Sequence, residues 1–256
     1  MVVKIMRDYL WVNIKTIFRI PLSVFFSVAY PILMMVIMMM SYGNPSIGEG
    51  YHLIDKYVMV VIGMGILPLT LVSFPIWVAS DIEDDSLKRM LFFKVKFKTI
   101  MSAEIIAHLL VGVFCIFIDI AFAKVIFGLN MPGIKYFLVF LIQYFIAVVV
   151  CILFGLLLAL MLPKTQALMP VGLITMFMMY MFCGAFVSYA ELPDKIRRIS
   201  GFLPIKYAMN DLLNIWMEKQ MFNNRFMLIS LIYIVALFTL VMIVYYKKYS
   251  HWRIKV

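Results

Sequence analysis

The chain has 256 residues, of which 65% are hydrophobic and 14% are charged, and its mean hydropathy is +1.03. Soluble domains are about 45–50% apolar and about 25% charged, so this composition excludes a soluble enzyme, a nucleic-acid-binding domain and a disordered chain. The formal net charge is +10 at pH 7. In a membrane protein, the placement of excess Lys and Arg indicates first how the chain is oriented across the membrane. The three cysteines lie in apolar stretches, which indicates neither a disulfide framework nor a metal site.

Six stretches are long and apolar enough to cross a bilayer, which takes about 20 mainly apolar residues. They cover residues 22–42, 57–79, 99–127, 135–162, 169–189 and 226–246, and we number them spans one to six. The longest remaining piece, 190–225, has 36 residues, and fewer than about 40 residues rarely hold a core of their own. The sequence therefore predicts an all-α, multi-pass membrane protein with a single transmembrane domain over 1–256.

The distribution of Lys and Arg predicts the orientation in the cell (inner or cytoplasmic) membrane. Six crossings place both termini on one side, together with segments 80–98 and 163–168. These four segments carry 14 of the 23 basic residues: Lys4, Arg7, Lys15, Arg19, Lys88, Arg89, Lys94, Lys96, Lys98, Lys164, Lys247, Lys248, Arg253 and Lys255. Basic residues near span ends stay in the cytoplasm, so both termini are expected there.

Two further segments have the pattern of helices at the membrane surface. Residues 4–19 separate charged from apolar side chains with helical spacing, which predicts an interfacial helix within 1–20. Its role is either to anchor span one or to dock a partner. Residues 190–225 alternate turn residues with two short apolar stripes, so we expect two short helices at the outer face, or dipping back into it as a re-entrant region.

Segment 80–98 is the most informative polar stretch. Ser80 and Glu83 fit a capping box, which predicts a helix start at Ser80. Acids come first and bases follow, and Asp84 with Lys88 and Asp85 with Arg89 have the spacing of ion pairs on a helix. This pattern predicts a short amphipathic helix on the cytoplasmic side, which is either a solvated connection or a docking surface for a soluble partner.

Span three carries an unusual stripe of polar and small residues at helical spacing. Its members are Glu104, His108, Gly112, Cys115 and Asp119. An ionised residue at the bilayer centre costs at least about 2.5–3.5 kcal/mol, so the stripe is expected to face protein or water. Three interpretations stay open: hydrogen bonding between helices, the lining of a polar passage, and a proton relay through Glu104, His108 and Asp119.

Catalytic and nucleotide-binding motifs are missing from the sequence. There is no G-x-x-x-x-G-K-[ST] phosphate loop and no H-E-x-x-H, and the three histidines are scattered. If the protein drives uphill transport, the energy has to come from a partner or an ion gradient. Methionine is abundant, with 23 residues in the chain, and it clusters in spans one and five. Its flexible side chains suit a passage for apolar or amphipathic cargo.

Two local patterns, together with the order of the segments, resemble a known family. After span two the chain reads Glu83-Asp84-Asp85-Ser86-Leu87-Lys88-Arg89-Met90-Leu91, and before span six it reads Leu203-Pro204-Ile205-Lys206-Tyr207. With the short connection Pro163 to Leu168, this layout is similar to the ABC-2 type membrane permease subunit of a bacterial ABC exporter of the drug, antibiotic or peptide type. Asp85 stands where the family usually has Gly, and Ser86 where it has Thr.

The resemblance implies that two such subunits, identical or different, pair around a passage, and that each docks a separate cytoplasmic ATP-binding subunit. That partner would bind ATP and Mg, whereas this chain would have no cofactor, metal or catalytic residue. The helix after span two would transmit ATPase closure, which assigns coupling to Asp81, Glu83, Asp84, Asp85, Leu87, Lys88 and Arg89.

Spans one, two and five usually face the passage in this family. The implied lining residues are Met35, Met38, Met39, Gly63, Gly65, Pro68, Met176, Met179 and Tyr180, and the outer re-entrant turn comprises Leu203, Pro204 and Tyr207. The expected substrate is a hydrophobic or amphipathic peptide, antibiotic or drug. Two alternatives are an ABC permease for polysaccharide or lipid-linked glycan and a stand-alone ion-coupled carrier that uses the Glu104/His108/Asp119 stripe.

Overall fold

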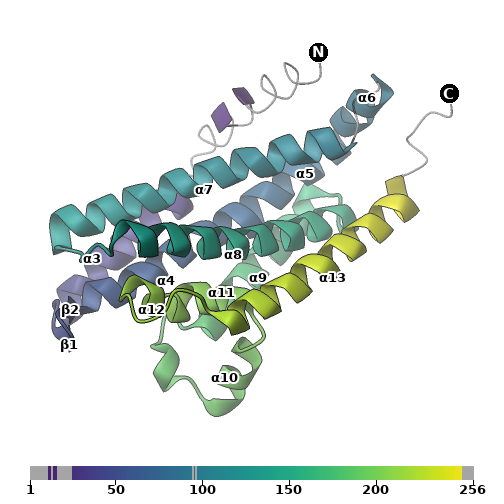
Figure 1. Ribbon diagram of the computed structural model, residues 1–256. Coiled ribbons are helices and arrows are strands. Elements are labelled where there is room, and N and C mark those ends of the chain that lie inside the picture. Colours follow the sequence, from purple (N-terminus) through teal and green to yellow (C-terminus); the bar gives the residue numbers. More distant parts are fainter. Residues whose placement is uncertain (1–10, 13, 16–24, 94, 96, 250–256) are drawn as a thin grey trace.

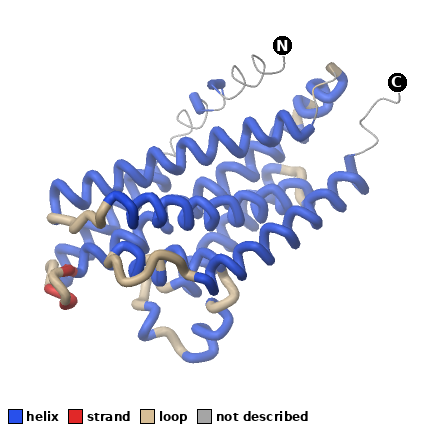
Figure 2. Tube along the Cα trace, in the orientation of Figure 1, coloured by secondary structure: helices blue, strands red, loops and turns tan. Residues whose placement is uncertain are grey.

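The computed structural model describes residues 11–12, 14–15, 25–93, 95 and 97–249, most of which are helical (Figures 1 and 2). From residue 25 onward the helical segments are η1 (Phe25–Ala29), α3 (Tyr30–Tyr42), α4 (Leu53–Pro68), η2 (Leu69–Ser73), α5 (Phe74–Glu83), α6 (Ser86–Phe92), α7 (Phe97–Phe127), α8 (Ile134–Met161), α9 (Thr165–Cys183), η3 (Tyr189–Glu191), α10 (Asp194–Ser200), α11 (Pro204–Lys206), η4 (Tyr207–Asp211), α12 (Leu213–Trp216) and α13 (Asn224–Tyr249). Segments η1, η2 and η4 are π-helical, and η3 is a 3-10 turn. Strands β1 (Ser46–Gly48) and β2 (Tyr51–His52) pair as an antiparallel hairpin.

Six helical segments are long and apolar enough to span a membrane. They are Phe25–Tyr42, Leu53–Glu83, Phe97–Phe127, Ile134–Met161, Thr165–Cys183 and Asn224–Tyr249. The prediction of an all-α protein with six spans is confirmed, and each predicted stretch overlaps one of these segments. Span five ends earlier than predicted, because Gly184 adopts a left-handed φ of 80° directly after Cys183 and stops the helix.

The predicted interfacial helix over 4–19 lies largely outside the described residues, and the tail 250–256 lies wholly outside them. Of the helix, Lys15 Nζ lies 5.1 Å from the centroid of the Trp11 ring. Ile14 packs against an apolar cluster formed by Leu69, Ala107, Val111 and Cys115. This part of the N-terminal segment therefore contacts spans two and three.

Span two continues past the predicted boundary to Glu83. Helix α5 runs through Ser80, so the predicted helix start and capping box at Ser80 are wrong. The chain breaks instead at Asp85, whose φ is 55°, and α6 begins at Ser86. The helix persists because its buried face, which includes Val78 and Ala79, continues beyond the predicted end to Ile82.

The connections alternate between the two ends of the bundle (Figure 1). One end, which we call the α6 end, holds α6, the α8–α9 turn and the C-terminal end of α13. The other, the hairpin end, holds the β1–β2 hairpin, the α7–α8 turn and segment 184–223. Hydrogen bonds join segments at each end: Lys248 Nζ donates to the Met161 carbonyl at the α6 end (2.9 Å), and Asn44 Nδ2 donates to the Phe127 carbonyl at the hairpin end (3.2 Å).

Span two forms the centre of the bundle and is interrupted by two prolines. In α4, all residues from Ile54 to Pro68 except Lys56 are buried. Proline has no N–H, so Pro68 cannot donate to the Met64 carbonyl and Pro75 cannot donate to the Leu71 carbonyl. Between the two prolines the helix widens into η2, where the Phe74 N–H donates to the Leu69 carbonyl five residues back.

Span five supports both weakened positions of span two. The Tyr180 hydroxyl donates to the Met64 carbonyl at 2.6 Å. Gly172 lies against the other position, where an added Cβ would be 2.6 Å from the Leu71 carbonyl oxygen. Span four approaches η2 in the same way, because a Cβ on Gly155 would overlap with the Thr70 carbonyl oxygen. Spans four and five thus pack directly on the irregular backbone of span two.

The Tyr180 hydrogen bond predicts a difference between two tyrosine variants. Tyr180→Phe leaves the buried Met64 carbonyl without this donor, so we expect it to lower stability by about 1–3 kcal/mol. The matched control is Tyr144→Phe, because the buried Tyr144 hydroxyl has no hydrogen-bond partner among the described residues. Thermal unfolding of the purified variants in detergent measures both effects, and equal melting temperatures for the two would contradict the role of Tyr180.

Candidate functional site

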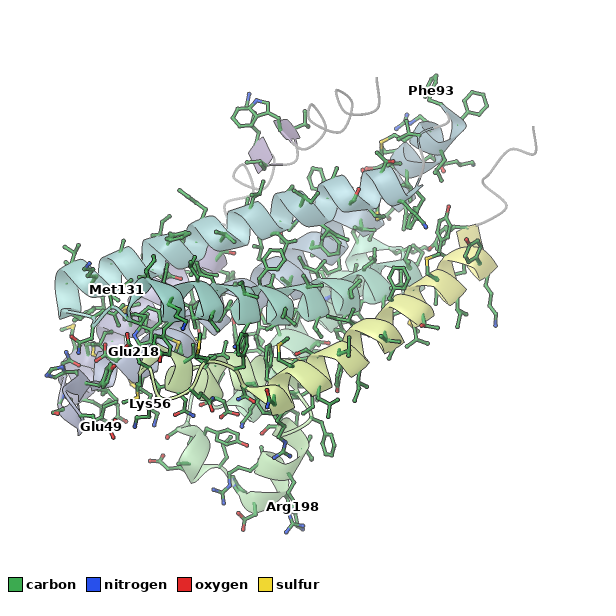
Figure 3. All side chains as sticks on the ribbon, in the orientation of Figure 1. Glu49, Lys56, Phe93, Met131, Arg198 and Glu218 are labelled. Carbon is green, nitrogen blue, oxygen red and sulfur yellow. The ribbon has the colours of Figure 1, made fainter. Side chains whose placement is uncertain are left out.

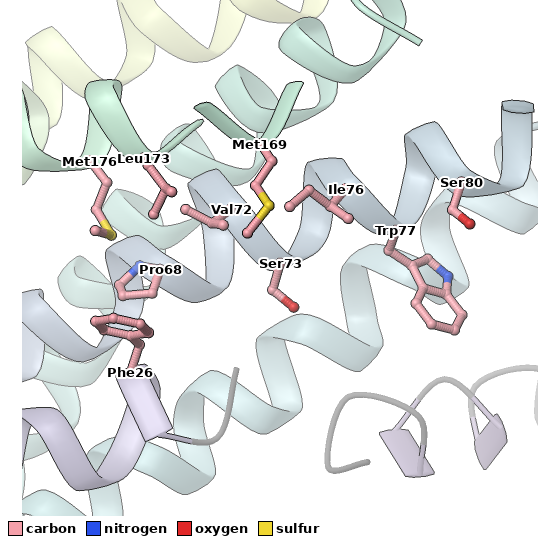
Figure 4. Close-up of a pocket in the computed structure, with 10 residues that line it drawn as sticks. All are labelled: Phe26, Pro68, Val72, Ser73, Ile76, Trp77, Ser80, Met169, Leu173 and Met176. Atoms are coloured by element: carbon pink, nitrogen blue, oxygen red, sulfur yellow. The ribbon is translucent and has the colours of Figure 1, made fainter. Parts of the chain in front are cut away.

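An apolar cavity lies between spans one, two and five (Figure 4). Its volume is about 250 Å³, and its lining residues are Phe26, Pro68, Val72, Ser73, Ile76, Trp77, Ser80, Met169, Leu173 and Met176. Side chains from α9 point toward span two, and Phe26 of η1 lies beside Pro68 (Figure 4). The volume approaches the range of about 300–1,000 Å³ that is typical of small-molecule sites.

The irregular part of span two forms the largest share of this cavity. Pro68 ends α4, Val72 and Ser73 belong to η2, and Ile76 lies one turn further, in α5. The polar groups at the cavity are few and neutral: two serine hydroxyls and the indole of Trp77. Such a lining favours an apolar or amphipathic ligand, because a charged group would lose its hydration there without gaining an opposite charge.

Trp77 connects the cavity to the polar stripe of span three. Its indole Nε1 donates to Glu104 Oε1 at 2.6 Å, while its ring lines the cavity. A short side-chain hydrogen bond of this kind holds an aromatic side chain in one orientation. The sequence analysis missed Trp77, because nothing in its spacing of 27 residues from Glu104 indicates the contact.

All five residues of the stripe are buried in α7, and the contacts at several positions along it are with span two. The His108 ring meets Phe74 edge to face, with 5.0 Å between the ring centroids, and its Nδ1 lies 3.0 Å from the Glu104 carbonyl oxygen. Near the other end, an added Cβ on Gly65 would lie 3.6 Å from Asp119 Oδ2. The stripe thus packs on protein, and the passage and proton-relay interpretations stay predictions.

At the α6 end, Glu83 joins span two to span five. Its carboxylate accepts hydrogen bonds from the Thr165 backbone N–H (3.1 Å) and hydroxyl (2.8 Å). Thr165 is the first residue of α9, where free N–H groups and the helix dipole favour a negative charge. Glu83 therefore caps a helix of its own chain, and its implied role in coupling to an ATPase stays a prediction.

The charged residues of α6 form pairs other than the predicted ones. Lys88 Nζ lies 3.7 Å from Asp85 Oδ1, and Arg89 Nη2 donates to the Asp84 carbonyl (3.1 Å) and the Ser86 hydroxyl (3.2 Å). The expected pairs four residues apart are wrong, because the chain breaks at Asp85 and the acids do not share a continuous helix with the bases.

The outward surface of α6 combines charged and aromatic groups. Leu87 is buried and Asp81 is partly exposed, while the exposed residues are Glu83, Asp84, Asp85, Lys88, Arg89, Phe92 and Phe93. The two phenylalanines are 63% and 76% exposed, and Phe93 lies at the tip of the segment in Figure 3. Aromatic residues and Arg are enriched at protein interfaces, so this surface is a candidate docking surface.

Most of the implied passage-lining residues are packed inside the chain. Pro68 and Met176 line the cavity. Met35, Met39, Gly63, Gly65 and Tyr180 are buried, and Met38 and Met179 are partly buried. Gly63 allows Met209 of η4 to approach, since an added Cβ would overlap with that side chain. A lining role between two protomers stays a prediction for these residues.

The outer turn before span six packs against span two and span five. Leu203 is partly buried and Pro204 and Tyr207 are buried. The Tyr207 hydroxyl donates to the Gly201 carbonyl at 2.8 Å, and burial raises the pKa of this phenol above its usual value. Asn210 Nδ2 donates to the Cys183 carbonyl at 2.8 Å. The turn is therefore fastened to the end of α9.

Asp55 organises the hairpin end, although the sequence analysis did not select it. The buried carboxylate accepts hydrogen bonds from the His52 N–H (2.7 Å) and the Asn130 N–H (2.8 Å). The Asn130 carbonyl in turn accepts a hydrogen bond from Trp216 Nε1 (2.9 Å). The sequence can indicate Asp55 as an acid in the first turn of an apolar helix. It does not indicate the partner Asn130, which lies 75 residues away.

Comparison with known proteins agrees with this architecture. A family model described as "ABC-2 type transporter" matches residues 8–217, which is most of the chain. A search among curated proteins finds no match. The matched region includes five of the six spans, the cavity, α6 and the outer turn. The chain therefore belongs to the ABC-2 type transporter family, as the membrane-spanning permease component of an ABC transporter rather than its ATPase.

Proposed function

We propose that two copies of this permease, or one copy and a related permease, form the passage of an exporter for hydrophobic or amphipathic substrates such as peptides, antibiotics or drugs. The observation that carries the proposal is the apolar cavity formed by spans one, two and five. Among the described residues, its lining contains no charged side chain, so it favours an apolar group over a sugar phosphate. A separate ATP-binding subunit, which binds ATP and Mg, supplies the energy.

The α6 end faces the cytoplasm in this proposal. An excess of Lys and Arg lies on that side, and such an excess retains a segment in the cytoplasm. The exposed charged and aromatic surface of α6 is then available to the ATP-binding subunit. The chain belongs to a family that works with an ATP-binding partner. This membership argues against a stand-alone ion-coupled carrier, which would need no such partner.

The contacts suggest how movement of α6 reaches the cavity. Helix α6 follows α5 directly, and Glu83 at the end of α5 caps α9 through Thr165. Residues of α5 and α9 form opposite walls of the cavity. A displacement of α6 therefore moves both walls together, relative to Phe26 of span one. ATP binding changes the passage only if the partner contacts α6 differently in its two states.

The docking surface can be tested with charge reversals on α6. We expect Lys88→Glu combined with Arg89→Glu to weaken co-purification of the ATP-binding subunit by about tenfold or more, because like charges then face each other across the interface. Lys98→Glu is the control, since Lys98 is also exposed and follows α6 at the start of α7. Unchanged co-purification of the double variant would place the docking surface elsewhere.

The link between α5 and α9 can be tested with a double-mutant cycle. Glu83→Ala and Thr165→Val each remove part of one contact, so each is expected to lower substrate-stimulated ATP hydrolysis about fivefold or more. The double variant should be no worse than the stronger single variant, because both changes break the same contact. Glu191→Ala, an exposed acid at the hairpin end, should combine additively with Thr165→Val. Additive losses in the Glu83 cycle would contradict the link.

The substrate class can be tested by filling the cavity. Leu173→Trp places a large ring in the cavity, whereas Ile174→Trp, the next residue on α9, places it on the exposed side. In cells with the ATP-binding subunit, we expect the wild type and Ile174→Trp to protect against lipophilic antibiotics or amphipathic antimicrobial peptides. Leu173→Trp should lose that protection while expression persists.

Two results of the substrate test would change the proposal. If the wild type protects against no compound of the panel, while deletion of its gene removes a surface polysaccharide, the glycan-exporting alternative replaces the proposed substrate class. If Leu173→Trp protects as well as the wild type, the substrate does not pass through this cavity.

A further inference from the structure

A second cavity, with a polar and basic lining, lies at the hairpin end. Its volume is about 720 Å³, and its lining includes Tyr189, Arg197, Arg198, Lys206, Tyr207 and Arg225. They come from η3, α10, α11, η4 and the start of α13. Helix α10 projects from the bundle, with Arg198 at its outer side (Figure 3). The family resemblance implies an outer turn that includes Tyr207, but it assigns no ligand to this cavity.

Two of the four basic residues in this cavity are already neutralised. Lys206 Nζ forms an ion pair with Asp211 at 2.7 Å, and it lies 4.6 and 4.5 Å from the ring centroids of Tyr189 and Tyr207. The ammonium is thus held in place by one carboxylate and two aromatic faces. Arg197 is paired with Asp194 within the first turns of α10.

The other two basic residues leave an excess of positive charge. Within the described part of the chain, neither Arg198 nor Arg225 has a hydrogen bond or an ion pair, and both are exposed. Two guanidinium groups at one cavity suit a phosphate group, because each can donate two parallel hydrogen bonds to its oxygens.

An apolar surface begins directly beside these charges. Arg225 is the second residue of α13, and the exposed Leu228, Leu231 and Val235 follow it at intervals of three to four residues on one face of that helix. Within the cavity itself, Phe202 is 69% exposed. A ligand held at Arg225 therefore meets a long apolar strip that leads along span six. A free inorganic anion has no apolar part that could pack on this strip.

We propose that this cavity binds the headgroup phosphate of an anionic phospholipid, with Arg198 and Arg225 on the phosphate and one acyl chain along the exposed face of α13. Basic pockets beside membrane helices recognise anionic headgroups in this way. The site itself does not depend on the transport activity. If the α6 end faces the cytoplasm, as proposed above, the cavity at the opposite end takes its lipid from the outer leaflet.

The test measures lipid binding by the purified full-length chain in neutral detergent, without the ATP-binding subunit. Phosphatidylglycerol and phosphatidylcholine with the same acyl chains are titrated separately, and inorganic phosphate is titrated alone. Native mass spectrometry measures the lipid occupancy, and thermal unfolding measures stabilisation. We expect the chain to bind phosphatidylglycerol about tenfold more tightly than phosphatidylcholine, because only the former keeps a net negative charge for the unpaired guanidinium groups.

Arg198→Gln combined with Arg225→Gln should lower the affinity for phosphatidylglycerol about tenfold, since charge-assisted hydrogen bonds are lost. The control is Lys195→Gln, which removes an exposed charge from α10 outside the cavity and should bind as the wild type does. Both Arg side chains are exposed, so the double variant should unfold at the wild-type temperature without lipid.

Three results would overturn the proposal. They are equal affinity of the wild type for the two lipids, unchanged affinity of the double variant, and stabilisation by inorganic phosphate that equals that by phosphatidylglycerol at the same phosphate concentration. The last result would assign the site to a free anion. Because no transport is measured, failure here leaves the proposed export function unaffected, and failure of export leaves the lipid site unaffected.

Discussion

The absence of two backbone N–H groups in the middle of span two is the constraint on which the rest of the structure depends. Pro68 and Pro75 remove donors at membrane depth, where no water replaces them. The chain compensates in two ways. A π-helical segment lies between the prolines, and the Tyr180 hydroxyl of span five donates a hydrogen bond to the Met64 carbonyl. Span two is therefore stable only as the buried centre of a bundle.

The same irregular backbone creates the site. Close approach to η2 requires glycine on the neighbouring spans, and Gly155 and Gly172 provide it. On the side next to span one, the apolar cavity lies beside the widened helix. Trp77 lines that cavity, and its indole donates a hydrogen bond to Glu104. The polar stripe of span three therefore holds one wall of the cavity in place. The irregular segment of span two thus determines how closely spans four and five pack on it.

The two ends of the bundle are organised by different interactions. At the α6 end, an exposed carboxylate caps a helix, and the neighbouring charges remain on the surface. At the hairpin end, the buried Asp55 carboxylate joins three segments through the Asn130 backbone and Trp216. A buried, fully bonded carboxylate holds its partners in one arrangement, whereas surface ion pairs contribute little. The hairpin end is therefore the more rigidly connected of the two.

The number of spans, the all-α class and the acidic-then-basic segment after span two could be read from the sequence. These features depend on the local density of apolar residues and on the spacing of charges, and the membrane leaves few alternatives to a helix. The family resemblance was also readable, because its motifs are local. Only the tertiary structure decided that span two continues through Ser80, that Glu83 contacts Thr165 and that Trp77 faces Glu104. Such contacts join residues far apart in the chain, and helical periodicity indicates which face of a helix is buried but not which helix covers it.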